Sequence, residues 1–373
     1  MLLRIISAMN RTRFENEVVS LTGILDLAEK IERVGVRVRT LDMGKKIPNP
    51  LLAVRLAKWI RESKPDVIHA WMYHANLVGT LAANLAGNVP TVWSIHHSSL
   101  NPRFDRYRTM LVNRACALLS RRSPARIVCC SEASLRAHRA VGYAPEKLEV
   151  IPNGFDLEQV KPDPDARTSV RAELRVPPET PLIGIVARFH PHKDHRNFIA
   201  AAARLHETNP DVHFVLCGMG ITLQNTQLAE WIDVANLRSR CHLLGPREDI
   251  PRLFAAMDIA VSASSSEAFP VVIGEAMACG TPCVVTDVGD SAMIVGSSGL
   301  VVPPGNSEAL ADAMRKLIAA GRETLQELGA QARRRVREHF ALPAIVARYQ
   351  QIYEAVADAP RHSIPFPSFS NCA

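Results

Sequence analysis

Short runs of β-branched and other apolar residues alternate with helix-length amphipathic segments along almost the whole chain. This alternation permits few folds, because buried strands separated by helices form parallel sheets that helices cover on both faces. The expected strands are residues 18–22, 36–43, 66–71, 91–96 and 126–131 in the first half, and 181–189, 213–218, 241–245, 259–264, 281–287 and 299–304 in the second. The sequence therefore predicts two α/β halves, each Rossmann-like.

The chain length also indicates two domains, since 373 residues exceed what one hydrophobic core usually fills. The stretch IPNGFD and the acidic, proline-containing segment after it mark the boundary. We expect domains at residues 1–152 and 153–342. An amphipathic helix at about 343–358 should pack back on the first domain, and residues 359–373 should form a disordered tail.

Composition narrows the class of protein. No run of eighteen apolar residues is present, so a membrane-spanning helix is not expected, and the N-terminus does not read as a signal peptide. Eight cysteines form no CxxC pair, which favours reduced, buried thiols in a cytoplasmic enzyme and gives no spacing for a metal site.

Basic residues gather in one stretch of the first half. The net charge is +7, and a single acid, Asp105, stands among seven arginines. These are Arg103, Arg106, Arg108, Arg114, Arg121, Arg122 and Arg126. Such a cluster suits an anionic membrane surface, although a solvated helix face is an equal alternative. Aromatic residues are too sparse to stack bases, so nucleic acid is not an expected partner.

The segment Ser264–Gly280 carries the clearest chemistry. A strand ends in a polar loop, Pro270 opens a helix, and Gly280 ends it. The start of such a helix suits a diphosphate, because its first N–H groups are unpaired and its dipole is positive there. Glu267 in the loop can accept hydrogen bonds from sugar hydroxyls, and Glu275, about a turn inside the helix, can accept two from a ribose diol.

This segment resembles the signature of glycosyltransferase family 4, whose members are retaining enzymes with the GT-B fold. Six other segments resemble the family too: GIVARFHPHKD, LCGMG, HLLGPRED, IPNGFD, TDVGDSAMIV and GLVVPPGN. The resemblance covers roughly residues 10 to 355 and is strongest over roughly 148 to 310. It implies a first domain that binds the acceptor and a second that binds a nucleotide-diphosphate sugar, with a cleft between them.

The resemblance also assigns site residues. It implies catalytic roles for His96, Arg188, Lys193 and Glu267, with the two cations at the diphosphate and His96 at the transferred sugar. The donor-binding residues would be Gly218, Gly245, Phe269, Pro270, Val271 and Glu275, and His74 and Asn76 would lie on the acceptor side. Solvated cations, tight-turn glycines, an exposed helix carboxylate and core histidines are the structural alternatives.

The implied mechanism is front-face attack, in which the leaving diphosphate helps to take the acceptor proton. It needs no pair of carboxylates of the kind that glycosidases use. Since no Asp-x-Asp motif stands where a metal would be needed, we expect neither a metal nor another cofactor.

One departure concerns the N-terminus. Family members begin with a strand and a glycine-rich turn, whereas MLLRIISAMNRTRFENEVVSLT matches only the following helix and second strand. The N-terminal domain is therefore expected to be incomplete. Either the true start lies upstream, which we favour, or this is a shortened copy.

The leading interpretation is a retaining glycosyltransferase that moves a hexose to a saccharide or lipid-linked acceptor in polysaccharide or cell-envelope biosynthesis. It would be cytoplasmic, without a membrane-spanning helix, and peripheral at the inner face if the arginines bind lipid. The main alternative is a non-catalytic, sugar-nucleotide-binding paralogue. A GT-B epimerase is disfavoured by the style of the motifs.

Overall fold

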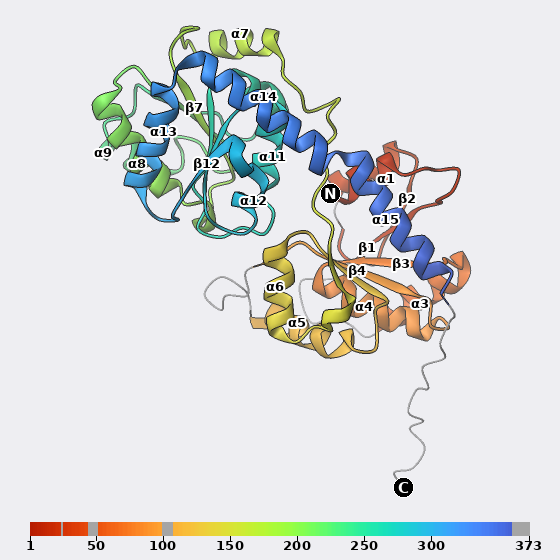
Figure 1. Cartoon of the computed structure of the whole chain (residues 1–373). Helices are drawn as coiled ribbons and strands as arrows, with labels where there is room; N and C mark the ends of the chain where they lie inside the picture. Colours follow the sequence, from red (N-terminus) through yellow and green to blue (C-terminus); the bar gives the residue numbers. More distant parts are fainter. Residues whose placement is uncertain (24, 44–50, 99–106, 360–373) are drawn as a thin grey trace.

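A computed structural model describes residues 1–23, 25–43, 51–98 and 107–359. The chain forms two α/β domains, drawn from red to yellow and from green to blue in Figure 1. The tail predicted to be disordered lies, from residue 360 on, outside the described residues. Within the described ranges, no helix combines the length and apolar character needed to cross a bilayer.

The first domain contains two parallel sheets. One pairs β1 (Glu17–Ser20) with β2 (Arg37–Thr40), and the other has the order β3-β4-β5-β6. Its strands are β3 (Ile68–Trp71), β4 (Thr91–Ile95), β5 (Arg126–Cys129) and β6 (Leu148–Val150). The sequence analysis did not identify β6, which is only three residues long. The expected absence of the strand with which family members begin stays a prediction.

Helices follow the strands of this domain in alternation. They are α1 (Leu2–Ala8), α2 (Leu25–Arg33), α3 (Leu51–Ser63), α4 (Met72–Leu85), α5 (Tyr107–Ser120), α6 (Glu132–Val141) and the 3-10 turn η1 (Pro145–Lys147). Every residue of β4 is buried. This burial explains why the strand reads as a continuous apolar run with little alternation.

The second domain has one six-stranded parallel sheet of order β12-β11-β10-β7-β8-β9. Its strands are β7 (Leu182–Val186), β8 (His213–Cys217), β9 (Cys241–Leu243), β10 (Ile259–Ser262), β11 (Cys283–Thr286) and β12 (Gly299–Val302). The six strands predicted in the second half are all present. The order reverses beside β7, and in such sheets ligands bind at the carboxyl ends of the strands near this point.

Helices cover both faces of this sheet. They are α7 (Pro164–Glu173), η2 (Pro191–Lys193), α8 (His195–Thr208), α9 (Thr226–Val234), α10 (Ile250–Ala256), α11 (Val271–Ala278), α12 (Ser291–Val295), η3 (Gly296–Ser298) and α13 (Ser307–Ala319). One core packs α8, α9 and α13 against the sheet. The other packs α7, α10, α11 and α12 on the opposite face. Two buried faces account for fully buried strands such as β10 and β11.

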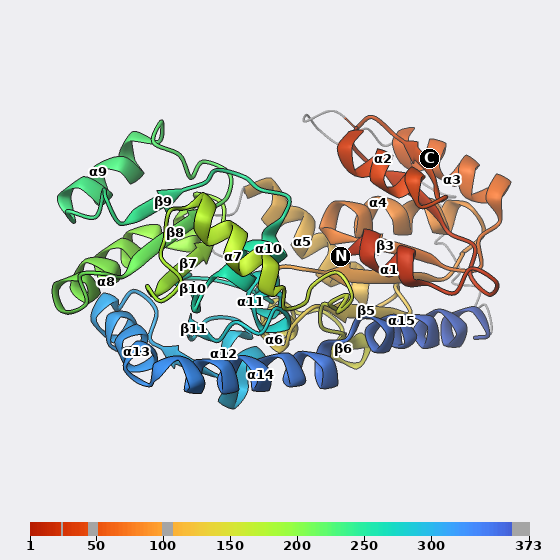
Figure 2. The same cartoon turned by 90° about the horizontal axis from the view of Figure 1, so that it is seen from above.

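Two final helices connect the domains. Figures 1 and 2 show α14 (Gly321–Phe340) along the second domain and α15 (Leu342–Ala357) along the first. The apolar face of α15 joins the same core as β4, β5 and α1. Phe155 donates its backbone N–H to Phe340 (2.9 Å) and accepts from Leu342 (2.9 Å), so the chain passes the domain junction twice, side by side.

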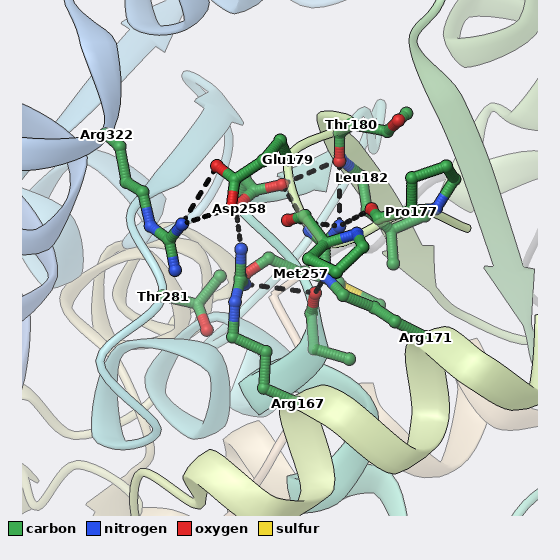
Figure 3. Close-up of polar contacts among 12 residues, drawn as sticks. Arg167, Arg171, Pro177, Glu179, Thr180, Leu182, Met257, Asp258, Thr281 and Arg322 are labelled. Carbon is green, nitrogen blue, oxygen red and sulfur yellow. Dashed lines mark hydrogen bonds and ion pairs between the residues drawn. The ribbon is translucent and has the colours of Figure 1, made fainter.

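A buried network of ion pairs joins α7 to the six-stranded sheet of the second domain (Figure 3). The Asp258 carboxylate accepts from Arg167 (2.7 Å) and from the backbone N–H of Leu182 at the start of β7 (2.8 Å). It also pairs with Arg171, whose side chain is only 3% exposed. Arg171 additionally donates to backbone carbonyls, including those of Ala256 (3.0 Å) and Thr180 (2.8 Å). The network lies at the amino end of β7, away from the strand ends where ligands bind.

The cysteines are buried as predicted, apart from the half-buried Cys241. The seven in the described residues are free thiols, and Cys372 lies outside that part of the chain. Burial raises the pKa of Cys116, Cys129 and Cys130 to about 12. These thiols are therefore neutral near pH 7 and poor nucleophiles.

Candidate active site at the domain junction

The loops after β4 and after β10 meet at the junction of the two domains. Ser98 donates its hydroxyl to the backbone carbonyl of Glu267. Close by, Arg4 of α1 forms an ion pair with Glu275 of α11 and donates to the carbonyl of Gly154 (3.4 Å). The carboxyl ends of strands from both sheets therefore supply residues to one region.

Helix α11 begins and ends where its sequence signals predict. Pro270 is the N-cap residue, and the helix ends at Ala278 with Cys279 as C-cap. Gly280 then takes the left-handed conformation, with φ +78°. No side chain caps the N-terminus, and its first turn contains no acidic residue. The helix start thus keeps the positive partial charge that attracts an anion.

A charge pair lies beside this helix start. Lys193, at the end of η2, forms an ion pair with Glu267, and their side chains are 23% and 12% exposed. Ser264 donates to the same carboxylate oxygen (2.7 Å). Ser265 donates its backbone N–H to His192 (2.9 Å), which holds the loops after β7 and β10 together. The structure therefore brings the predicted Lys193 and Glu267 into contact, whereas Arg188 is exposed to solvent.

Two predicted glycines occupy positions that only glycine fits well. Gly218 has φ +148° and donates its N–H to the carbonyl of Gly245 (2.8 Å). A Cβ on Gly218 would lie 2.2 Å from the carbonyl oxygen of Ala187. Gly245 is also left-handed, with φ +63°. Close backbone approach explains Gly218 and the positive φ explains Gly245, and their direct contact with a donor stays a prediction.

Glu275 is one turn inside α11, as expected, but its carboxylate is already in contact with the Arg4 guanidinium. The two side chains are 19% and 33% exposed. A ribose diol would therefore share or displace a cation from the first domain. The role of Glu275 in ribose binding stays a prediction.

The Phe269 side chain is placed differently from what a donor-binding role suggests. It is 6% exposed and packs against Phe155 (ring centroids 6.3 Å apart) and Phe340 (5.6 Å). Pro270 is also buried, and Val271 is half-buried. In this structure Phe269 can meet a donor only through its backbone, because its ring belongs to the core.

His96 follows β4 and stacks on Trp71, which ends β3. The ring centroids are 4.9 Å apart and the planes differ by 11°. Within the described residues, its buried Nε2 has no hydrogen-bond partner. Burial is the main cause that lowers the pKa of His96 to about 4, so the ring is neutral near pH 7. A neutral ring with an unpaired buried nitrogen suits a hydrogen bond to a ligand hydroxyl.

Trp71 itself was not identified from the sequence. Its place at the end of the neighbouring strand was the available signal, since β3 and β4 are in register with Trp71 opposite Ser94. Behind it, His69 contacts Tyr353 of α15 (2.6 Å) and Ser94 (2.7 Å). Burial lowers the pKa of His69 to about 3. Through Trp71 and His69, the position of His96 therefore depends on contacts that reach α15.

The two residues predicted for the acceptor side, His74 and Asn76, differ in burial. His74 is half-buried in the first turn of α4. Asn76 is fully buried, and its amide, in the orientation that satisfies both ends, donates to the carbonyls of Ala70 (3.0 Å) and Met72 (3.2 Å). Asn76 thus fixes the turn from β3 to α4 through its buried amide, and its predicted place on the acceptor side stays a prediction. The role of His74 stays a prediction.

Comparisons with known proteins identify the family and the fold. Residues 1–159 match the family described as Glycosyltransferase Family 4, and residues 166–335 match Glycosyl transferases group 1. The chain is 30% identical over 322 residues to an alpha-maltose-1-phosphate synthase of Mycolicibacterium smegmatis, covering 78% of this chain and 79% of that protein.

Two further relatives extend the comparison. The UDP-Gal:alpha-D-GlcNAc-diphosphoundecaprenol alpha-1,3-galactosyltransferase of Escherichia coli is 29% identical, over 74% of this chain and 70% of that protein. The structure of Anabaena Alr3699/HepE in complex with UDP superposes with a TM-score of 0.83, at 26% identity and 95% coverage of both chains. The chain belongs to glycosyltransferase family 4 and has the GT-B fold.

Proposed function

We propose that this glycosyltransferase moves a hexose from a UDP-sugar to a saccharide acceptor with retention of anomeric configuration. The observation that carries the proposal is the Lys193–Glu267 pair beside the uncapped start of α11. The relatives support the base, because the Escherichia coli enzyme is named for UDP-Gal and the Anabaena protein was solved with UDP and with UDP-glucose.

The donor diphosphate would lie against the start of α11. Lys193 and the helix N–H groups would stabilise the negative charge that grows on the departing UDP, and Arg188 would add a second cation. Glu267 would orient the sugar hydroxyls while holding Lys193 in place. No metal or cofactor is part of this proposal, because the lysine and the helix supply the positive charge.

The acceptor would enter from the side of the first domain. The unpaired Nε2 of His96 would hydrogen-bond a hydroxyl of the transferred sugar. The acceptor hydroxyl would attack from the face that the UDP leaves, and a diphosphate oxygen would receive its proton. Retention follows from attack on that same face.

Thermal denaturation with UDP, GDP and ADP tests the donor. We expect UDP at about a hundred times its Kd to raise Tm by about 5 °C or more, since a ligand stabilises the state that it binds. An equal or larger shift with GDP or ADP would contradict the choice of base.

Proton NMR of the product tests retention, and an inverted anomeric coupling would refute it. UDP binding without turnover would instead support the non-catalytic alternative.

A lipid-linked acceptor at an anionic membrane surface is the finer part of the proposal. Exposed apolar side chains recur on α5 beside cations: Tyr107 is 72%, Leu111 46% and Leu118 73% exposed. Arg114 and Arg121 are exposed on or just after the same helix. This mixture suits a surface of acidic lipids, because apolar groups can insert while arginines meet phosphates. Arg103 and Arg106, also predicted for this surface, lie outside the described residues.

Sedimentation with vesicles tests this surface. We expect binding to vesicles that contain an acidic phospholipid, weaker binding at high salt, and little binding to neutral ones. Replacing Arg114 and Arg121 with glutamate should abolish binding, and replacing the exposed Arg204 of α8 should not. Equal binding by both variants would remove α5 from the proposal and leave the donor site untouched.

A further inference from the structure

Asp290, on the loop after β11, is a residue of the second domain that caps a helix of the first. Its carboxylate oxygens accept hydrogen bonds from the backbone N–H groups of Glu132 (2.8 Å) and Ala133 (2.9 Å), the first two residues of α6. The next N–H, of Ser134, is satisfied within the first domain by Ser131 (2.9 Å). The start of α6 is therefore complete only when the two domains are together.

Because the Asp290 carboxylate is buried, losing its contact with the start of α6 would be costly. Asp290 is 3% exposed, and within the described part of the chain no lysine or arginine forms an ion pair with it. The partial positive charge of the α6 start is then its main counter-charge. If the domains separated, both the carboxylate and the two N–H groups would need water in place of each other.

The same loop also holds the donor side of the site. The Asp290 N–H donates to the carbonyl of Ala268 (3.0 Å). Gly289 has φ +59°, and a Cβ there would lie 2.4 Å from the carbonyl oxygen of Glu267. The backbone of the Glu267 loop is thus packed directly against the residues that reach α6.

Within the first domain, α6 forms a hydrogen bond with the segment that carries His96. Ser134, in the first turn of α6, donates its hydroxyl to the carbonyl of His97 (2.8 Å). A continuous path of hydrogen bonds therefore runs from Ala268 through Asp290 and the α6 start to His97. It joins the loop of Glu267 to the segment of His96 across the domain junction.

We infer that Asp290 is a positioning residue for sugar transfer, which holds the donor loop and the His96 segment in register by bridging the two domains. This inference rests on the proposed function for its kinetic consequence, but its structural part does not. Asp290 touches neither substrate in this role and acts through Ala268 and α6.

The test compares Asp290→Ala with Asp290→Asn and with Ser131→Ala. Ser131→Ala is the matched control, because it removes a cap from the same helix without crossing the junction. We expect Asp290→Ala to lower kcat about tenfold or more while the Kd for UDP changes by less than about threefold. Small-angle X-ray scattering should show a larger radius of gyration. Asp290→Asn should recover part of kcat and part of the compactness, because the asparagine carbonyl oxygen still accepts one hydrogen bond. Ser131→Ala should lower Tm only.

Unchanged kcat and radius of gyration in Asp290→Ala would overturn the inference. So would an equal loss of kcat in Ser131→Ala, because the effect would then come from α6 stability. If the unaltered protein transferred no sugar, the proposed function would fail. The scattering comparison would still decide whether Asp290 holds the domains together.

Discussion

Replacing Lys193 with alanine removes the cation that the structure places beside the start of α11. Its partner Glu267 is 12% exposed and keeps the hydrogen bond from Ser264 (2.7 Å). The free energy of unfolding should therefore fall by about 1–3 kcal/mol, the usual effect of leaving a partly buried polar group under-satisfied. Loss of a group that stabilises transition-state charge should lower kcat by about 10² to 10³, equivalent to about 2.7–4 kcal/mol. The effect on catalysis should exceed the effect on stability.

Steady-state release of UDP gives kcat and KM, and urea unfolding gives the stability of the same preparation. Lys193→Arg keeps the charge and should recover part of kcat. Arg196→Ala is the matched control, because Arg196 is an exposed cation in the first turn of α8. It should leave kcat and stability unchanged.

The reasoning fails if Lys193→Ala keeps kcat within about threefold of the unaltered protein. It also fails if Arg196→Ala loses as much activity, since general surface charge would then explain the effect. A loss of activity that tracks the fraction unfolded would assign Lys193 to folding and leave the donor site without its cation.

Two further predictions concern stability. Asp258→Ala should lower the free energy of unfolding by about 3–5 kcal/mol in urea titrations, because it leaves the Arg171 charge buried without its partner. Asp233→Ala, which breaks an exposed pair with Arg238, should leave the free energy of unfolding nearly unchanged, and equal losses in the two variants would refute the argument. Burial lowers the pKa of His138 from 6.5 to about 4, so the folded state binds fewer protons than the unfolded state between these values. Stability should therefore decline as pH falls from 6.5 toward 4, on the order of 3 kcal/mol for this group, and His138→Gln should flatten that decline when unfolding is measured across this range.

The donor side of the site could be predicted from sequence because its signals are local. Pro270 and Gly280 mark the two ends of α11, and the structure has the helix at Val271–Ala278. Lys193 and Glu267 each follow a strand of one parallel sheet, and β7 and β10 are neighbours in it. Carboxyl ends of parallel strands lie at one edge, so the fold class places both residues at that edge, while the family resemblance was needed to single out Lys193.

Packing between distant segments could not be predicted in this way. The Phe269 ring belongs to the core because Phe155 and Phe340 meet it, and neither lies near it in sequence. Asn76 looks like a polar residue available to a ligand, yet the carbonyls of Ala70 and Met72 use its amide. A polar residue at a strand end has the same local pattern whether it serves a ligand or the backbone.

The two sides of the site differ for a physical reason. Lys193, Glu267 and α11 follow strands of one sheet, and the Lys193–Glu267 pair forms within one domain. The orientation of His96 depends on Trp71 and, through His69, on Tyr353 of a helix that returns from the far end of the chain. In the proposed function, the cation that meets the diphosphate is therefore held within the second domain, whereas the proposed sugar transfer would also require the first domain, α15 and the junction between the domains to be in place. Binding and turnover should accordingly separate in variants of the junction.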